Sequence, residues 1–342
     1  MVNAVKKYFL LSLLIASSAV AKTESGLEEG MVNPGYVEQP AWFKHSFLDL
    51  DEDIAEAKND GKRLMLFFYQ DGCPYCKKML QDNFGQRDIA EKTRENFDVV
   101  SLNIWGDRQL SFAGVTATEK AFAESLKVMY TPTLVFFNES GKAVLRTNGY
   151  YYPEKLNAAL DYVLTHQDEK QSFRSYLSKQ STEKAKGKIH NQVETLSAPY
   201  DFSGVADKYR LVMFEQKQCK ECDELHLDIL KRKASVEQMN KFDIAVLDMW
   251  SEDTVKRPDG SQSTIKDWAK DLNIQYAPSL VYFDRQGREV FRSDAYLRAF
   301  HVQSVMDYVS SGAYKTQTNF QRYIDDRAHR LREQGVTVDI MN

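Results

Sequence analysis

Short apolar runs, separated by longer amphipathic stretches, mark the first half of the chain as an alternation of strands and helices. The runs at 64–68 and 134–137 are too short for helices and rich in aromatic residues, so they predict buried strands. Residues 97–104 alternate between apolar and polar side chains, which predicts a third strand. The other predicted elements are helices at 48–59, 73–84, 118–128 and 153–165, a loop at 106–116 and a return strand at 143–146.

The pattern of the first half returns 146 residues later. Cys219 follows Cys73 by this offset, and Pro278 follows Pro132 by the same offset. The apolar run at 280–283 likewise repeats an apolar run of the first half. Several matches at one offset indicate a duplicated domain. The order of elements predicts that each copy is an α/β domain, with a central mixed sheet flanked by helices.

Composition divides the rest of the chain. The stretch between the two copies is rich in lysine, glutamate, serine and glutamine, which predicts a linker that is helical in part near 173–177. The amphipathic helix at the C-terminal end is expected to dock on the second domain, with dimerisation as the alternative. The predicted division is a signal peptide at 1–21, a leader at 22–41, a first domain at 42–167, a linker at 168–200, a second domain at 201–315 and a helical tail at 316–342.

The first 21 residues have the pattern of a secretory signal. Lys6 and Lys7 precede an apolar segment at 9–16, and small residues follow it up to Ala21. The apolar segment is too short to span a bilayer, so we expect cleavage after Ala21 and a periplasmic or secreted protein without stable membrane insertion. A retained N-terminal anchor is the alternative.

Charge and cysteine content narrow the function. The formal net charge of −4 leaves no basic excess for a phosphate backbone, so we exclude nucleic acid as a partner. All four cysteines fall into two Cys-x-x-Cys pairs. Bridges that stabilise exported proteins usually close long loops, whereas these pairs close very short ones. The spacing therefore favours redox chemistry over two local structural disulfides.

The position of the cysteines explains how such chemistry would work. Cys73 follows the turn signal at Asp71 and Gly72, where a helix is predicted to begin. Free N–H groups and the positive end of the helix dipole stabilise a thiolate there. Cys76 lies one helical turn further along, within reach of the first sulfur.

Both halves resemble the thioredoxin superfamily, in the Cys-x-x-Cys at a helix start and the distant proline that opens a strand. The segments Gly-Cys-Pro-Tyr-Cys and Thr-Pro-Thr-Leu-Val-Phe-Phe are most similar to exported bacterial thioredoxins of the SoxW type. The resemblance implies two thioredoxin-like domains without a cofactor. The site residues that it implies are the nucleophiles Cys73 and Cys219, the resolving thiols Cys76 and Cys222, and the cis prolines Pro132 and Pro278.

A cis proline pins a sharp turn, so the residue before it, Thr131 or Ala277, is expected to pair its backbone with an extended substrate. The chain also departs from cytosolic thioredoxin. Phe67 and Met213 stand where that protein has a buried aspartate, so proton transfer is expected to use water or another group.

The charges near the two pairs differ. Lys220 and Glu221 are expected to cancel, which leaves Asp223 and Glu224 to disfavour the Cys219 thiolate. This predicts a more oxidising first site and an electron flow from the second site to the first. Two sites that act independently on separate substrates are the alternative.

Three features allow other interpretations. His226 follows Cys222 by four residues, which fits either a copper or zinc site or a helix histidine packed in the domain. Trp105 and Trp250 fit packing anchors better than walls of a substrate groove. The segments after them, 106–116 and 251–262, are predicted to be recognition loops.

The sequence thus predicts an exported thiol-disulfide oxidoreductase. Its partners would be disulfide-containing proteins or small thiol compounds, together with a redox donor that the sequence does not identify. The alternative function is a metal-binding module or chaperone for copper or zinc that uses the same cysteines.

Overall fold

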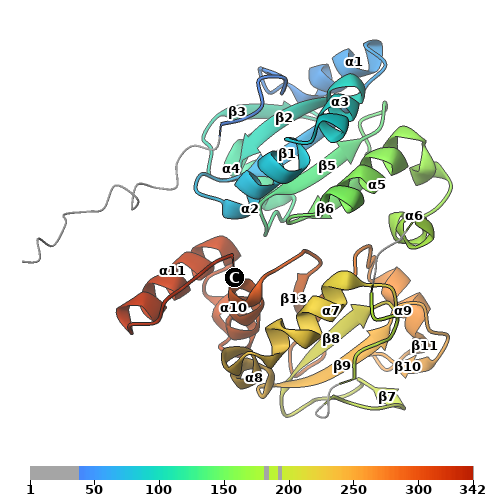
Figure 1. Ribbon diagram of the computed structural model, residues 1–342, viewed down its shortest axis with the longest axis vertical. Helices are drawn as coiled ribbons and strands as arrows, with labels where there is room; N and C mark the ends of the chain where they lie inside the picture. The colour runs from blue at the N-terminus through green and yellow to red at the C-terminus, as the bar shows by residue number, and fades with distance from the viewer. Residues whose placement is uncertain (1–37, 181–184, 192–194, 342) are drawn as a thin grey trace, which may run out of the picture.

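The chain folds into two similar α/β lobes (Figure 1). The structure, a computed structural model, describes residues 38–180, 185–191 and 195–341. The predicted signal peptide and most of the predicted leader lie outside these residues. We refer to residues 38–180 as lobe 1 and to residues 195–341 as lobe 2. No helix in the described ranges is long and apolar enough to cross a membrane.

Lobe 1 is built on a four-stranded mixed sheet in the order β2-β1-β5-β6. Strand β1 pairs in parallel with β2 and antiparallel with β5, and β5 pairs antiparallel with β6. The strands of lobe 1 are β1 (Arg63–Tyr69), β2 (Phe97–Asn103), β3 (Gln109–Phe112), β4 (Val115–Thr118), β5 (Thr133–Phe137) and β6 (Ala143–Asn148). Its helices are α1 (Leu50–Asn59), α2 (Pro74–Lys78), the π-helical turn η2 (Met79–Asn83), α3 (Arg87–Asn96), α4 (Glu119–Ser125), α5 (Pro153–Leu164), the 3-10 turn η3 (Gln167–Glu169) and α6 (Phe173–Gln180).

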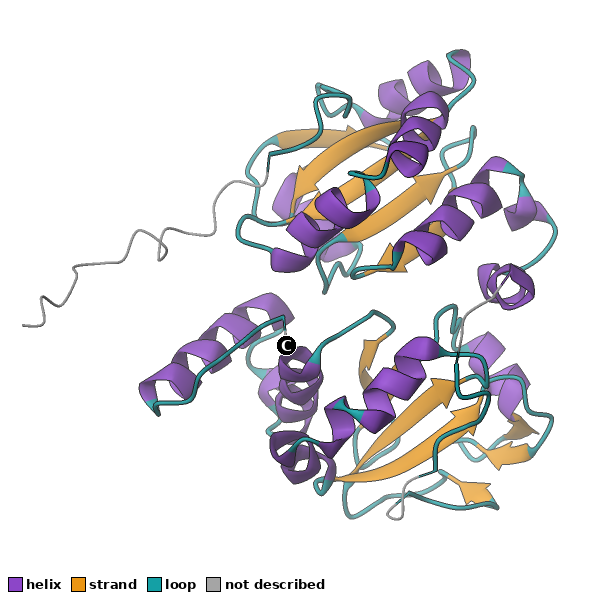
Figure 2. Cartoon of the chain, viewed as in Figure 1, coloured by secondary structure: helices purple, strands orange, loops and turns teal. Residues whose placement is uncertain are grey.

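Helices cover both faces of this sheet, which is why β1 is apolar at every position from Leu64 to Phe68 (Figure 2). Successive side chains of a strand point to opposite faces. Phe67 accordingly packs with Met79 of η2 and Leu156 of α5, whereas Leu66 packs with residues of α1 and α4.

Lobe 2 repeats the arrangement with a sheet in the order β9-β8-β12-β13. A small second sheet, in the order β11-β10-β7, lies beside it. The strands of lobe 2 are β7 (Tyr200–Asp201), β8 (Tyr209–Glu215), β9 (Phe242–Asp248), β10 (Thr254–Lys256), β11 (Gln262–Thr264), β12 (Ser279–Phe283) and β13 (Glu289–Ser293). Its helices are α7 (Lys220–Leu227), η4 (Ile229–Lys231), α8 (Lys233–Met239), α9 (Ile265–Asp271), α10 (Ala299–Ser310), η5 (Ala313–Lys315) and α11 (Phe320–Glu333).

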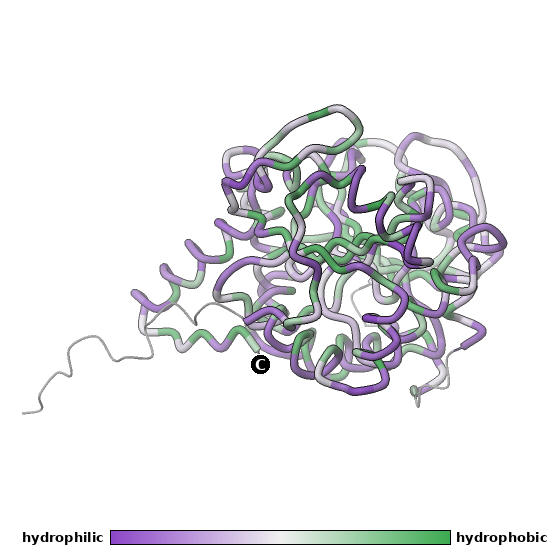
Figure 3. The backbone as a smooth tube through the Cα atoms, turned by 90° about the horizontal axis from the view of Figure 1, so that it is seen from above, coloured by the Kyte–Doolittle hydropathy of each residue, from purple (hydrophilic) through white to green (hydrophobic). Residues whose placement is uncertain are grey.

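The predicted fold class is confirmed, because each lobe has a central mixed sheet flanked by helices. The hydrophobic segments run through the interior, and the outer helices and loops are largely hydrophilic (Figure 3).

Two predicted loops are wrong. Residues 106–116 include most of the hairpin β3–β4, in which Ala113 and Gly114 both have positive φ, as a two-residue hairpin turn requires. Residues 251–262 likewise contain β10 and the start of β11. The sequence pattern also missed α3 and α8, because these helices bury few residues and so carry only a weak apolar stripe.

Each lobe inserts one tyrosine into the core of the other lobe. Tyr130 of lobe 1 enters the core of lobe 2, where its ring packs on Phe291 and Phe320. Tyr276 of lobe 2 enters the core of lobe 1 and packs on Tyr151. Tyr130 and Tyr276 are equivalent positions of the repeat, 146 residues apart. The interface therefore relates the two lobes by an approximate twofold axis.

Contacts between other equivalent positions support the same axis. The Tyr150 ring packs against that of Tyr296, and a backbone bridge joins the two residues. Asn148 Nδ2 donates to the carboxylate of Asp294, its equivalent in lobe 2. Residues that repeat in the sequence thus meet in space.

The last helices of the two lobes, α6 and α11, are also equivalent. Phe173 of α6 packs on Tyr162, and Phe320 of α11 packs on Tyr308, with ring centroids 5.2 Å apart in both pairs. Helix α11 docks on lobe 2 as predicted. The helix in the predicted linker is therefore the lobe 1 counterpart of the C-terminal helix.

We expect the Phe320→Ala change to lower the free energy of unfolding by about 3–5 kcal/mol, because it leaves a cavity where α11, lobe 2 and Tyr130 meet. Val336→Ala is the matched control, since this side chain is 47% exposed in the same tail. Denaturant unfolding measures both, and similar small losses for the two variants would contradict the assigned docking.

Candidate functional site

The first cysteine pair lies directly after the central strand of lobe 1. Gly72, with φ at 73°, turns the chain from β1 into α2, and Cys73 is the N-cap of that helix. Cys73 and Cys76 form a disulfide with Cα atoms 5.2 Å apart. Cys73 Sγ accepts the Cys76 N–H at 3.0 Å, and Pro74 at the first helical position leaves no competing donor. The first sulfur therefore receives a backbone N–H that would stabilise a thiolate.

Thr131 faces this sulfur. Its Oγ1 donates to Cys73 Sγ at 3.3 Å, and its carbonyl oxygen lies 3.4 Å from the same atom. The peptide bond between Thr131 and Pro132 is cis. The structure thus brings the segment before Pro132 against Cys73.

The second pair repeats this geometry in lobe 2. Cys219 is the N-cap of α7, its Sγ accepts the Cys222 N–H at 3.1 Å, and the two cysteines form a disulfide. The bond between Ala277 and Pro278 is cis, and Ala277 shares a buried cluster with both cysteines. Alanine has no hydroxyl, so the second site lacks the counterpart of the hydrogen bond from Thr131.

A tryptophan stands beside each pair. Trp105 Nε1 donates to Gln70 at 2.8 Å, and Trp250 Nε1 donates to Gln216 at 3.1 Å. Gln70 and Gln216 each lie three residues before the first cysteine of their pair. A hydrogen bond therefore fixes each tryptophan to the segment that leads into a cysteine pair.

Each tryptophan is also covered from the other lobe. Arg322 of α11 lies over Trp105, and Arg174 of α6 lies over Trp250, with the guanidinium carbon 5.2 and 5.0 Å from the ring centroid. The last helix of each lobe therefore reaches over the entrance of the other lobe's cysteine pair.

The residue before the second cysteine of each pair is held by the opposite lobe. Tyr75 Oη accepts the Arg298 N–H at 3.2 Å and lies 3.5 Å from His301 Nδ1. Burial raises the pKa of Tyr75. In lobe 2, Glu221 pairs with Lys155 of lobe 1 at 2.6 Å. Only 3% of Cys73 and 2% of Cys219 is exposed.

Sequence reasoning missed these contacts between the lobes. A signal was present, since Lys155 and His301 are equivalent positions of the repeat, as are Tyr75 and Glu221. The repeat says which positions correspond, but it does not say that corresponding positions meet.

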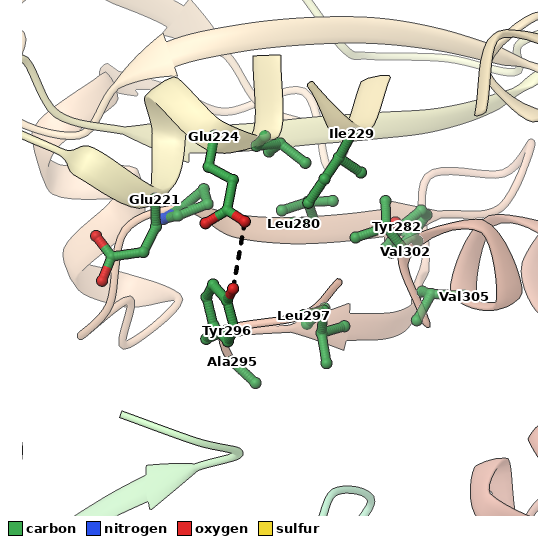
Figure 4. A pocket seen from close by; sticks show the side chains of 13 residues that line it. Glu221, Glu224, Ile229, Leu280, Tyr282, Ala295, Tyr296, Leu297, Val302 and Val305 are labelled. Atoms are coloured by element: carbon green, nitrogen blue, oxygen red, sulfur yellow. Dashed lines mark hydrogen bonds between the residues drawn. The ribbon is translucent and has the colours of Figure 1, made fainter. Parts of the chain in front are cut away.

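The acids near the second pair have partners that the sequence did not predict. The Lys220 ammonium lies over the ring of Tyr152, and Glu221 pairs with Lys155 of lobe 1. Glu224 pairs instead with Arg298 and accepts a hydrogen bond from Tyr296, as Figure 4 shows for the tyrosine. Each acid of the first turn of α7 thus has a partner, including Asp223, which bonds to His190 at 2.6 Å. These partners offset part of the negative charge that was expected to disfavour the Cys219 thiolate.

His226 is packed inside lobe 2. Its Nε2 lies 2.5 Å from Glu215 Oε1, and its ring stacks on that of His190. Among the described residues, no three His, Cys, Asp or Glu side chains are grouped so that they could hold a metal ion.

A thioredoxin-like domain model matches the chain twice, at residues 50–164 and 203–310. The chain belongs to the thioredoxin-like domain family. A relative is the thiol:disulfide interchange protein DsbD of Pseudoalteromonas atlantica, 29% identical over 96 residues. This match covers 28% of the chain and only 15% of the relative's length.

Solved structures that resemble the chain each cover about a third of it. A thioredoxin-fold protein from Helicobacter pylori is 21% identical over 35% of this chain and 81% of its own, with a TM-score of 0.32. A thioredoxin from Thermus thermophilus is 24% identical over 34% of this chain and 83% of its own, with a TM-score of 0.27. Likenesses at this level carry no information on substrate or activity.

The family and the two cysteine pairs at disulfide distance support thiol-disulfide exchange as the chemistry of both sites. These matches show the family, and they do not distinguish SoxW-type thioredoxins from its other members.

The buried imidazole of His301 predicts a pH-dependent interface. Burial lowers the pKa of His301 from 6.5 to about 4, so the folded chain holds this ring neutral while the unfolded chain protonates it. Stability should therefore fall as the pH drops from about 6.5 towards 4, by about 2 kcal/mol at pH 5.

The His301→Asn change removes this titration, so the variant should lose less stability than the wild type between about pH 7.5 and pH 5 in thermal unfolding. His329→Asn, at a side chain that is 74% exposed, should behave like the wild type. Equal losses for the wild type and His301→Asn would contradict the assignment.

Proposed function

We propose that the chain is an exported thiol-disulfide oxidoreductase that exchanges disulfides with protein or small sulfur-compound partners at both sites. The observation that carries this proposal is the position of Cys73 and Cys219, each the N-cap of a helix with its sulfur accepting a backbone N–H. Such a sulfur is stabilised as a thiolate, which is the nucleophile in disulfide exchange.

The reaction follows from this geometry. In the reduced protein, the Cys73 thiolate attacks one sulfur of a partner disulfide, and the other partner sulfur leaves as a thiolate that takes up a proton. Cys76 then loses its proton and attacks Cys73 Sγ, which forms the Cys73–Cys76 disulfide and releases the second partner thiol. Two electrons have passed to the partner. Cys219 and Cys222 perform the same steps in lobe 2.

The resolving thiols lack the buried aspartate that takes part in proton transfer in cytosolic thioredoxin. Phe67 and Met213, which occupy the corresponding strand positions, are apolar and fully buried. The proton of Cys76 or Cys222 therefore passes to water or to another group of the chain.

Thr131 and Ala277 are the proposed docking positions for an extended substrate, through their backbone groups beside Pro132 and Pro278. Both nucleophiles are buried, and Tyr75 and Glu221 beside them contact the opposite lobe, so a protein substrate is expected to displace part of the interface. A small thiol compound needs a smaller opening.

The proposed location is the periplasm or the exterior, with residues 1–21 as a signal peptide cleaved after Ala21. The relationship to a thiol:disulfide interchange protein fits a partner protein that supplies or removes electrons. Trapping of mixed disulfides identifies the substrate and the redox donor.

The Cys76→Ser variant should accumulate a mixed disulfide between Cys73 and its partner, because no thiol remains to resolve it. Cys73→Ser, in which the nucleophile is absent, is the control and should trap nothing at this site. Capture from an extract of the source cells followed by mass spectrometry of the non-reduced adducts reads out the result.

Turnover tests the function independently. The wild type should catalyse reduction of a model disulfide protein by dithiothreitol, and the double variant Cys73→Ser/Cys219→Ser should fall to the uncatalysed rate. Catalysis that survives in this variant, or a wild type that binds copper or zinc tightly but shows no catalysis, would contradict the proposal.

A further inference from the structure

A cation from lobe 1 reaches the cysteine pair of lobe 2. Lys155, in the first turn of α5, places its Nζ 2.6 Å from Glu221 Oε1. Glu221 lies between the two cysteines of the second pair, directly before Cys222. The contact is buried, with 8% of the Lys155 side chain and 2% of the Glu221 side chain exposed.

The same ammonium also contacts the other wall of the second site. Lys155 Nζ lies 4.9 Å from the centre of the Tyr276 ring. Tyr276 directly precedes Ala277, whose peptide bond to Pro278 is the cis bond of the second site. Lys155 therefore bridges the two segments that flank the Cys219–Cys222 disulfide.

The first site receives a different group at the equivalent position. His301 corresponds to Lys155 in the repeat and contacts Tyr75, which corresponds to Glu221. His301 and Tyr75 are both neutral when buried, whereas Lys155 and Glu221 are both charged. The architecture is shared between the two sites, but among the described residues only the second site has an ion pair that crosses the interface.

We propose that Lys155 is a positioning residue of the second site, which tunes the redox potential of Cys219–Cys222 by compensating the charge of Glu221. Glu221 Oε2 has no hydrogen-bond partner among the described residues, so Lys155 provides the counter-charge to a buried carboxylate. An uncompensated carboxylate two residues from Cys219 would destabilise the thiolate of the reduced form. The proposal rests on the proposed function and concerns the regulation of the same site.

The proposal couples the potential to the contact between the lobes. When the lobes meet as in the structure, Lys155 offsets Glu221 and favours the dithiol. When a substrate separates them, Glu221 loses its counter-charge and the second site becomes more reducing. Separation of the lobes would therefore drive electrons out of the second pair into the substrate that opened the interface.

The test is the equilibrium between the second pair and glutathione, in full-length protein that carries Cys73→Ser and Cys76→Ser. Two glutathione thiols reduce the Cys219–Cys222 disulfide, which gives two protein thiols and one glutathione disulfide, so the protons and electrons balance. Alkylation of free thiols and mass spectrometry report the ratio of dithiol to disulfide.

Two single variants should shift this equilibrium in opposite directions. Lys155→Met leaves Glu221 uncompensated, so the equilibrium should move about tenfold towards the disulfide, which is about 30 mV more reducing. Glu221→Gln leaves the cation in place, so it should move the equilibrium in the opposite direction. The double variant should return close to the starting value, and Lys155→Arg should preserve it, because the charge is retained.

A purely structural role would not give opposite signs, because either single change would only loosen the interface. Lys92→Met is the matched control. Lys92 of α3 pairs with Asp161 of α5, the helix that carries Lys155, and its polar contacts among the described residues stay within lobe 1. It should leave the potential unchanged. Shifts of the same sign for Lys155→Met and Glu221→Gln, or no shift for either, would overturn the proposal.

The outcome also separates this inference from the proposed function. If the second pair cannot be reduced reversibly in any variant, the proposed function fails at this site. If the pair titrates reversibly but responds equally to every variant, the function stands and the role of Lys155 is refuted.

Discussion

The reciprocal insertion of Tyr130 and Tyr276 is the contact on which the rest of the structure depends. Each tyrosine lies two residues before a cis proline, so each ties the proline loop of its own lobe to the core of the other. Burial of a side chain of this size contributes about 2–3 kcal/mol. Two such insertions fix the faces of the lobes that carry the cysteines against each other, and they set the approximate twofold axis.

Once this axis is fixed, the other contacts between the lobes follow from the repeat. Helices α6 and α11 each end their own lobe and cover a tryptophan of the other, through Arg174 and Arg322. Lys155 and His301 each reach the cysteine pair of the opposite lobe. A buried ion pair adds little net stability, because desolvation offsets the attraction between the charges. The ion pair between Lys155 and Glu221 is therefore better explained by its effect on the second site than by its contribution to folding.

The local sequence pattern was sufficient for the main strands, the cysteine sites and the repeat, but not for the hairpin β3–β4 or for helices α3 and α8. The apolar strands, the Cys-x-x-Cys pairs at helix starts and the offset of 146 residues predicted the fold class and the duplication. Short-range patterns could not give the contacts between the lobes, since nothing near Tyr130 or Lys155 indicates what lies opposite. The equivalence of α6 and α11 was missed for a different reason. Phe173 and Phe320 are offset by 147 residues and lie in polar surroundings, where the pattern suggested a linker and a tail.

The central claim is that both cysteine pairs are redox-active and not structural bridges. The most direct test equilibrates the unmodified full-length protein with glutathione buffers of graded ratio, traps the free thiols by alkylation, and assigns them by peptide mass spectrometry. The account predicts that Cys73–Cys76 and Cys219–Cys222 each pass reversibly between disulfide and dithiol within the range that glutathione buffers. A pair that stays a disulfide in fully reduced glutathione would be a structural bridge, and the account of that site would be wrong.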